Sequence, residues 1–151
     1  MISLTDKPLD AAEALRRFEQ TNPAAGAIVT FSGKVRENAG AKTVTKLFLE
    51  HTPGLTEKGI AHIGDAACER WQVNEVQIIH RVGEIPAGET IVFVAAASAH
   101  RRDSFQAADF LMDYLKSEAL FWKKEIYQDG SSSWIEPRMQ DYHDKKRWIS
   151  A

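Results

Sequence analysis

The apolar residues of this chain switch between helical and strand spacing several times along 151 residues, and that switching limits the folds open to it. Residues 56–71 and 104–116 carry apolar side chains three and four positions apart, which predicts two amphipathic helices. A shorter helix is predicted from Pro8, which suits a first helical turn, through Phe18. Six β-rich stretches lie between and after these helices, at 26–36, 43–50, 76–82, 90–97, 121–127 and 133–135.

The order of these elements predicts an α+β fold with a mostly antiparallel sheet. Turn-forming residues fill 37–40 and 86–88, and Asp129-Gly130 predicts a hairpin between the last two strands. Because no internal repeat or low-complexity linker divides the chain, we expect a single domain over 1–151. From about Pro137 the sequence is a polar, basic tail, in which Trp148 is the candidate for docking on the rest of the chain.

The composition argues against several classes of protein. A formal charge of -2 and a pI near 6.2 give no reason to expect bulk binding to nucleic acid or to an anionic membrane. Cys68 is the single cysteine, so no internal disulfide can form, and the start of the sequence lacks a signal-peptide pattern. We therefore expect a soluble, cytoplasmic protein. The five histidines are scattered and no cysteine pair occurs, so we expect neither a metal site nor a cofactor.

Three clusters of residues could carry chemistry, and the first precedes the helix over 104–116. Arg101 and Arg102 follow His100 there, although positive charge opposes the dipole at a helix N-terminus. Free backbone N–H groups and arginine side chains both bind phosphate or carboxylate, so this segment is a candidate anion site. The alternative is that both arginines reach solvent or pair with Asp103.

The second cluster is the strand end at 31–36. Lys34 and Arg36 share one face of this strand, and Gly33 predicts a bulge or a close approach of another backbone. Arg36 stands where the strand enters its turn, a position from which it could contact a ligand. The alternative is an exposed, charged strand end.

The third cluster combines Lys116, at the end of a helix, with Lys123, which lies on the same side of a strand as Phe121 and Tyr127 because side chains alternate along it. Desolvation and nearby positive charge both make a lysine lose its proton more easily. A neutral lysine can act as a nucleophile or base, and a charged one can stabilise an oxyanion. The alternative for either lysine is an ordinary solvated side chain.

Together these segments resemble the large, catalytic subunit of molybdopterin synthase, over about residues 26–135. The matching stretches are 31–36, 49–51, 79–84, 92–94, 98–101, 112–116 and 121–125. The resemblance implies an α/β-hammerhead fold with a further small α+β part. It also implies a homodimer that binds a small ubiquitin-like subunit at each end. The C-terminal Gly-Gly thiocarboxylate of that subunit gives sulfur to cyclic pyranopterin monophosphate. This sequence ends without Gly-Gly, so it resembles the acceptor subunit.

The resemblance assigns roles to individual residues. Lys116 and Lys123 match the two active-site lysines of the family. The other matches are positions in or near its substrate pocket: Arg36, His100, Arg101, Phe31 and Met112. One departure lies between the two lysines, where Leu120 stands in place of a proline that is common in the family.

These matches lead to a mechanistic hypothesis. Arg101, with His100 and Arg36, would hold the phosphate of the pterin. Lys116 would stabilise charge on the thiocarboxylate while Lys123 acts as acid and base, or the two lysines would exchange these roles. Other readings stay open: a non-enzymatic module that binds ubiquitin-like tails, a transferase acting on another phosphorylated metabolite, and a plain structural domain.

Overall fold

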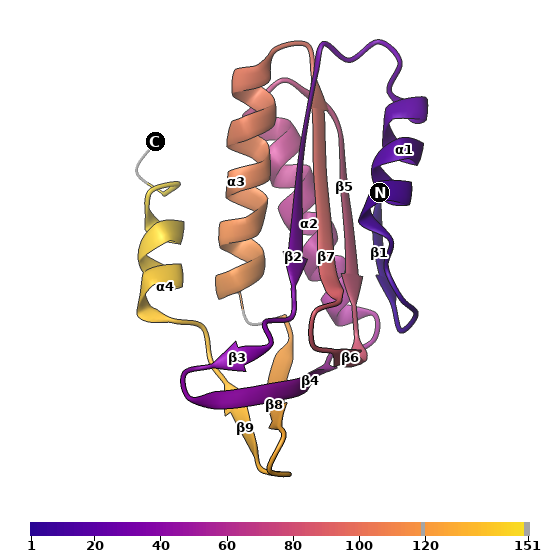
Figure 1. Cartoon of the computed structure of the whole chain (residues 1–151). Helices are drawn as coiled ribbons and strands as arrows, with labels where there is room; N and C mark the ends of the chain where they lie inside the picture. Colours follow the sequence, from indigo (N-terminus) through magenta and orange to yellow (C-terminus); the bar gives the residue numbers. More distant parts are fainter. Residues whose placement is uncertain (119, 150–151) are drawn as a thin grey trace.

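Two β-sheets organise the chain, and its path crosses from one to the other several times (Figure 1). The computed structural model describes residues 1–118 and 120–149. The first sheet has the order β1-β5-β7-β2, with β1 at Ile2–Thr5, β5 at Val73–Arg81, β7 at Thr90–Ser98 and β2 at Ala27–Lys34. The second sheet contains β3 at Asn38–Ala39, β4 at Lys42–Glu50, β6 at Gly83–Pro86, β8 at Trp122–Tyr127 and β9 at Ser132–Ile135.

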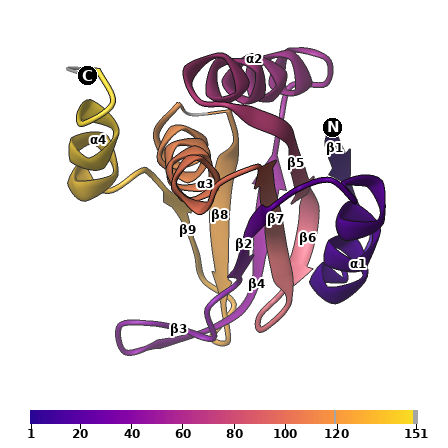
Figure 2. The ribbon, with the colours of Figure 1, turned by 90° about the horizontal axis from the view of Figure 1, so that it is seen from above.

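Helices cover both faces of the first sheet (Figure 2). The helices α2 (Leu55–Arg70) and α3 (Arg101–Ser117) pack on one face, and α1 (Ala11–Thr21) packs on the other. The short helix α4 (Met139–Lys146) lies beside α3. Strand β7 is buried over 91–98, because it runs between these layers, and its sequence is therefore apolar without alternation. No helix within the described residues is long and apolar enough to cross a membrane.

The main core fills the layer between the first sheet and the pair α2 and α3. Ile60 of α2, Ile78 of β5 and Leu111 of α3 are fully buried there. A smaller cluster lies under α1, where Phe18 packs near Phe93 of β7. Cys68 is half-buried against the main core, and burial raises the pKa of its thiol, as expected for a structural cysteine.

The predicted α+β class is confirmed, and each described strand pairing is antiparallel except that of β1 with β5. The three predicted helices and six predicted strands all occur. The prediction that Pro8 opens the first helix is wrong, because Asp10 caps α1 by accepting a hydrogen bond from the backbone N–H of Glu13 at 3.1 Å. The hairpin at Asp129-Gly130 is confirmed by the pairing of β8 with β9.

Four short elements are absent from the sequence prediction. The strands β1 and β6 have four residues each and β3 has two, too few for an alternating pattern to show. The predicted turn at 37–40 therefore contains β3. The segment predicted as a polar tail contains α4, and Trp148 beyond that helix docks on the core with only 8% of its surface exposed.

Gly33 marks the point where the chain leaves the first sheet. The register between β2 and β7 shifts between Gly33 and Lys34, which confirms the predicted bulge. A Cβ atom on Gly33 would lie 2.8 Å from Cγ1 of Val92, so only glycine fits against β7 here. Beyond the bulge, the backbone N–H of Val35 donates to the carbonyl of Glu89 at 2.9 Å, and this bond holds the chain as it crosses toward the second sheet.

Candidate active site

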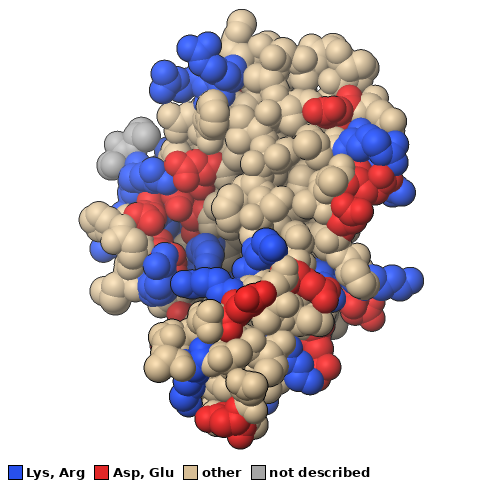
Figure 3. Space-filling model, viewed as in Figure 1, with Lys and Arg blue, Asp and Glu red and all other residues tan. Residues whose placement is uncertain are grey.

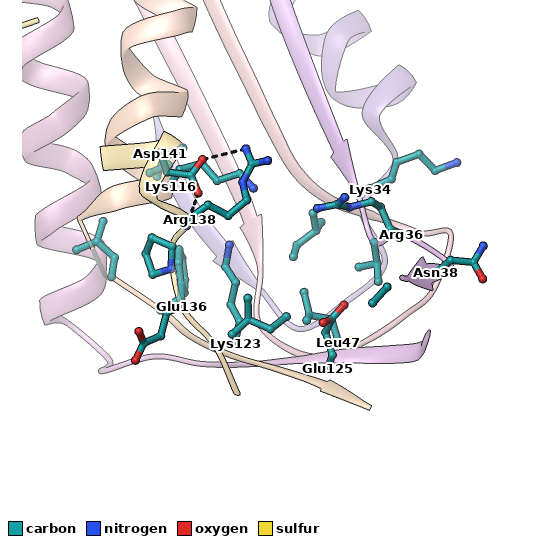
Figure 4. Close-up of a pocket in the computed structure, with 18 of the residues that line it drawn as sticks. Lys34, Arg36, Asn38, Leu47, Lys116, Lys123, Glu125, Glu136, Arg138 and Asp141 are labelled. Carbon is teal, nitrogen blue, oxygen red and sulfur yellow. Dashed lines mark hydrogen bonds and ion pairs between the residues drawn. The ribbon is translucent and has the colours of Figure 1, made fainter. Parts of the chain in front are cut away.

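A cleft with two lobes lies between the second sheet and the C-terminal end of α3. The lobes have volumes of about 300 and about 330 Å³. Both are lined by Lys34, Ile91, Leu115, Lys116 and Lys123, which makes them parts of one cleft. The first lobe adds the charged residues Arg36, Glu125, Glu136, Arg138 and Asp141 (Figure 4). The second lobe adds Phe31, His80 and Met112.

Two elements bring the lysines of the cleft together. Lys116 lies in the last turn of α3, and Lys123 lies on β8, paired with Leu49 of β4 and with Ile135 of β9. Figure 4 shows both amines pointing toward the same space, with Arg36 and Arg138 on either side of it. With Lys34, which lines both lobes, the structure therefore brings five cationic side chains from four segments to one cleft.

Leu120, which lies between the two lysines in sequence, is held against α2. The hydroxyl of Thr56 donates to the carbonyl of Leu120 at 3.2 Å. The side chain of Leu120 lies directly over Gly59, where an added Cβ atom would be only 2.7 Å from it. Leucine at this position thus provides a packing contact that helps to set the position of Lys123 relative to Lys116.

The environment of Lys123 makes its amine unusually acidic. Burial is the largest cause, the charge of Lys116 adds to it, and Asp141 opposes it, so that the pKa of Lys123 falls from 10.5 to about 8. An amine with this pKa carries a proton in most molecules at pH 7 but releases it readily. It can therefore both give and take a proton during a reaction.

His80 is a residue of the cleft that the sequence analysis does not identify. It is 4% exposed, its ring stacks on Phe121 at 4.2 Å, and its Nδ1 lies 2.8 Å from the carbonyl oxygen of Arg81. A carbonyl only accepts, so Nδ1 carries the proton and Nε2 keeps its lone pair. The pKa of His80 falls to about 3, mainly because the ring is buried and to a lesser extent because Lys123 and Lys116 are positively charged. His80 is thus a neutral side chain in a cationic cleft.

Arg138 and Asp141 also escape prediction from the sequence, because they lie in a polar stretch without a helical or strand pattern. The backbone N–H of Arg138 donates to Asp141 at 2.8 Å, and its guanidinium lies 3.3 Å from the other carboxylate oxygen. Burial pushes the pKa of Asp141 upward, but the hydrogen bonds and charge of Arg138, with the charge of Lys116, hold it below its usual value. The Asp141 carboxylate therefore places a negative charge among these cations, in the lobe that Glu125 and Glu136 also line.

His100 and Arg101 lie at the opposite end of α3 from Lys116. The helix has 17 residues, which corresponds to a length of about 25 Å. Both side chains are exposed and line a shallow hollow with Gly26, Ala27 and Arg102. Figure 3 shows positive side chains around the hollow between the two sheets and a separate positive group over the start of α3.

Within one chain, then, the structure brings together five of the seven residues singled out from the sequence: Lys116, Lys123, Arg36, Phe31 and Met112. It does not bring His100 and Arg101 to them. A molecule the size of a pterin cannot contact both ends of α3 in the same chain.

The fold and the cleft define an α+β protein that can hold an anionic ligand beside a buried, partly neutral amine. Comparison with known proteins gives the family. The model described as "MoaE protein" matches residues 4–118. The chain is 50% identical over 123 residues to the molybdopterin synthase catalytic subunit of Escherichia coli, covering 82% of this chain and 81% of that protein. It is 45% identical over 148 residues to the subunit of the same name from Caulobacter vibrioides, covering 98% and 97%.

Solved structures agree with the sequence comparison. The molybdopterin biosynthesis MoaE protein of Burkholderia ambifaria superimposes with a TM-score of 0.82 at 38% identity, covering 99% of this chain and 97% of that one. The chain belongs to the MoaE family, and the family resemblance inferred from the short motifs is confirmed.

Proposed function

We propose that this chain is the catalytic subunit of a molybdopterin synthase, a sulfurtransferase of molybdenum cofactor biosynthesis. Relatives that share 45–50% of its residues carry that name. The substrate would be cyclic pyranopterin monophosphate, and the sulfur donor would be the C-terminal thiocarboxylate of a small ubiquitin-like subunit. The observation that carries the proposal is the meeting of Lys116, Lys123 and Arg36 in one cleft, because both reactants are anions and one amine there exchanges its proton near neutral pH.

The positions of the two lysines suggest their roles. Lys116 is exposed at the border of the two lobes, where a fixed positive charge stabilises a thiocarboxylate and the oxyanion formed from it. Lys123 is more deeply placed and has the lowered pKa, which suits the transfer of a proton to the departing oxygen. Phe31 and Met112 line the second lobe, through which a Gly-Gly tail without side chains would approach.

A homodimer would give His100 and Arg101 a part in the same reaction. Strand β2 ends the order of the first sheet, and among the described residues no strand pairs with its outer edge. His100 and Arg101 lie beside Ala27 at one end of β2, whereas Lys34 lies at the other end, next to the cleft.

Two copies that paired antiparallel along β2 would place residue 27 of one beside residue 34 of the other, because a two-fold axis reverses the strand. His100 and Arg101 of the second copy would then stand at the mouth of the cleft that contains Lys116 and Lys123. This arrangement reconciles the proposed phosphate-binding role of Arg101 with the length of α3. We also propose a cytoplasmic location, on the ground of the single thiol.

Turnover in a purified system tests the proposed function. The chain is mixed with a thiocarboxylated ubiquitin-like partner and cyclic pyranopterin monophosphate, and the dithiolene product is quantified. We expect Lys116→Ala and Lys123→Ala each to lower turnover by about a hundredfold or more, because each removes a charge or a proton donor from the reaction. Lys124→Ala is the matched control, since Lys124 lies on the other face of β8, over the Trp134 ring, and does not line the cleft.

Near wild-type turnover in both cleft variants would exclude the assigned site. Binding of the partner without any product from the wild-type chain would favour a non-enzymatic module that recognises ubiquitin-like tails. Product formation from a different phosphorylated metabolite would favour another transferase.

A further inference from the structure

The helix α4 needs an anchor, because its own sequence gives it little reason to fold. It has eight residues, and Asp141 is the one buried side chain among them. Isolated helices of this length are marginal in water, and α4 lacks an apolar face that could dock it along its length. Its position beside α3 must therefore be set by contacts at its ends.

Trp148 provides the anchor at the C-terminal end of α4. Its ring meets Trp71 edge-on at 5.5 Å and Phe110 at 5.7 Å, inside the main core. The indole Nε1–H donates to the carboxylate of Asp113 on α3 at 2.6 Å. The backbone carbonyl of Trp148 accepts a hydrogen bond from the guanidinium of Arg70, at the end of α2.

Ion pairs on the surface extend this anchor along α3. Arg147 lies 2.7 Å from both Asp109 and Asp113, and Lys145 lies 3.0 Å from Glu118. Exposed pairs of this kind contribute little on their own, so the buried indole supplies most of the attachment.

The other end of α4 lines the first lobe of the cleft. Arg138, the residue before the helix, and Asp141, in its first turn, both face Lys116 and Lys123 (Figure 4). At 1.5 Å per residue, α4 spans about 12 Å, so the anchored end and the end at the cleft are separated by a single rigid element. Displacement of one end must move the other.

We propose that Trp148 is a positioning residue for the active site: it holds α4 against α3, so that Arg138 and Asp141 close the first lobe beside the two lysines. The effect on turnover rests on the proposed function, whereas the effect on α4 does not. Trp148 itself lines neither lobe, so it acts only through the helix.

The experiment compares Trp148→Ala, Trp148→Phe and Ile149→Ala in the full chain by amide hydrogen exchange and turnover. In Trp148→Ala we expect faster exchange over 138–146, unchanged exchange in β5 and β7, and a kcat/KM lower by about tenfold to a hundredfold. Trp148→Phe keeps an aromatic ring in the core, so its exchange over 138–146 and its kcat/KM should both stay close to those of the wild type. Ile149→Ala is the matched control, because Ile149 is the next residue and is 69% exposed. This substitution should change neither the exchange over 138–146 nor kcat/KM.

A reagent that needs no substrate separates this proposal from the proposed function. Trinitrobenzenesulfonate labels accessible neutral amines, and we expect it to modify Lys123 faster in Trp148→Ala, because the first lobe is open. If the wild-type chain makes no product with an active partner, the proposed function fails, but exchange and labelling still test the anchor.

Unchanged exchange over 138–146 in Trp148→Ala would overturn the proposal. So would a uniform rise in exchange across the chain, since Trp148 would then only stabilise the core. If Trp148→Ala does not fold, Trp148→Leu carries the test, because it keeps an apolar side chain in the core but removes the edge-on ring contacts with Trp71 and Phe110 and the hydrogen bond to Asp113. Wild-type exchange over 138–146 in that variant would count equally against the anchor.

Discussion

Lys123 combines two properties that conflict in a folded protein, a basic side chain and a largely buried position. Its amine loses hydration in the cleft and faces the charge of Lys116, and the pKa falls to about 8 as a result. His80 does not relieve this conflict, because it stays neutral and contributes no negative charge. Asp141 does so in part, which is a second reason for α4 to lie at the cleft.

The lowered pKa predicts that Lys123 costs the protein stability at neutral pH. Below about pH 8 both the folded and the unfolded chain carry the proton, and the folded chain bears the full cost of the buried charge. Between about pH 8 and 10.5 the folded chain releases the proton first, so the cost disappears as the pH rises. We therefore expect Lys123→Met to increase the free energy of unfolding at pH 7 by on the order of 1–3 kcal/mol, although turnover is lost.

Urea unfolding of the two chains at pH 7 and at pH 10 measures this difference. The gain should be large at pH 7 and small at pH 10. Lys124→Met, on the opposite face of β8, should change stability little at either pH. A Lys123→Met chain less stable than wild type at pH 7 would show that the amine makes favourable contacts that outweigh its desolvation.

The residues of the cleft were predictable to different degrees. Lys116, Lys123 and Arg36 fall in motifs with a recognisable order along the chain, and the fold brings those motifs together. Arg138 and Asp141 follow a hairpin and stand in a polar stretch, where nothing in the local pattern separates a site residue from a solvated one. Their position depends on a tertiary contact, which local spacing does not encode.

At the scale of elements, the relation between α3 and β8 depends on a contact with α2. Thr56 is 3% exposed, and its hydroxyl accepts from the backbone N–H of Thr52 at 3.1 Å while it donates to the carbonyl of Leu120. The start of α2 is thereby joined to Leu120, just before β8. Thr56 itself does not line the cleft, so loss of its hydroxyl would act on the site through Leu120, which does.

We accordingly expect Thr56→Val to lower the free energy of unfolding by about 1–2 kcal/mol, because the partly buried N–H of Thr52 and carbonyl of Leu120 both lose the hydroxyl as a partner. Turnover should fall by more than the loss of folded protein explains, since the two lysines are no longer held at a fixed separation. Chemical denaturation and turnover at a temperature where both chains are folded give the two quantities. Thr56→Ser keeps the hydroxyl, so its free energy of unfolding and its turnover should both stay close to wild type. If Thr56→Ser loses as much of each as Thr56→Val does, the methyl group of Thr56, and not its hydroxyl, is responsible.

Helices and strands were predictable from the sequence where packing on one face gives their apolar residues a regular spacing. The helices α2 and α3 show their apolar faces in the sequence because both cover the first sheet. The strands β1 and β6 are held by β5 and β4, partners that lie far away in sequence, and α4 is held by Trp148. Elements whose stability comes from such distant contacts leave only a weak local signal.

At the scale of the whole molecule, the chain has two basic regions separated by the length of α3. One contains Lys116 and Lys123, and the other contains His100 and Arg101. If the second region binds the phosphate of the same substrate, it must come from another copy of the chain. The exposed edge of β2, on which Phe31 is 41% exposed, is the surface where the two copies would meet.

Mixed dimers test this arrangement directly. Lys123→Ala and Arg101→Ala chains, each nearly inactive alone, are unfolded together in equal amounts and refolded. If each site combines Lys123 of one copy with Arg101 of the other, random pairing leaves about one site in four intact, and the mixture should recover about a quarter of wild-type turnover. If both residues serve the site of their own chain, every site in the mixture carries one substitution and no turnover returns. A mixture of Lys123→Ala with Lys116→Ala, both at the same cleft, should stay inactive in either case and so controls for exchange of subunits without complementation.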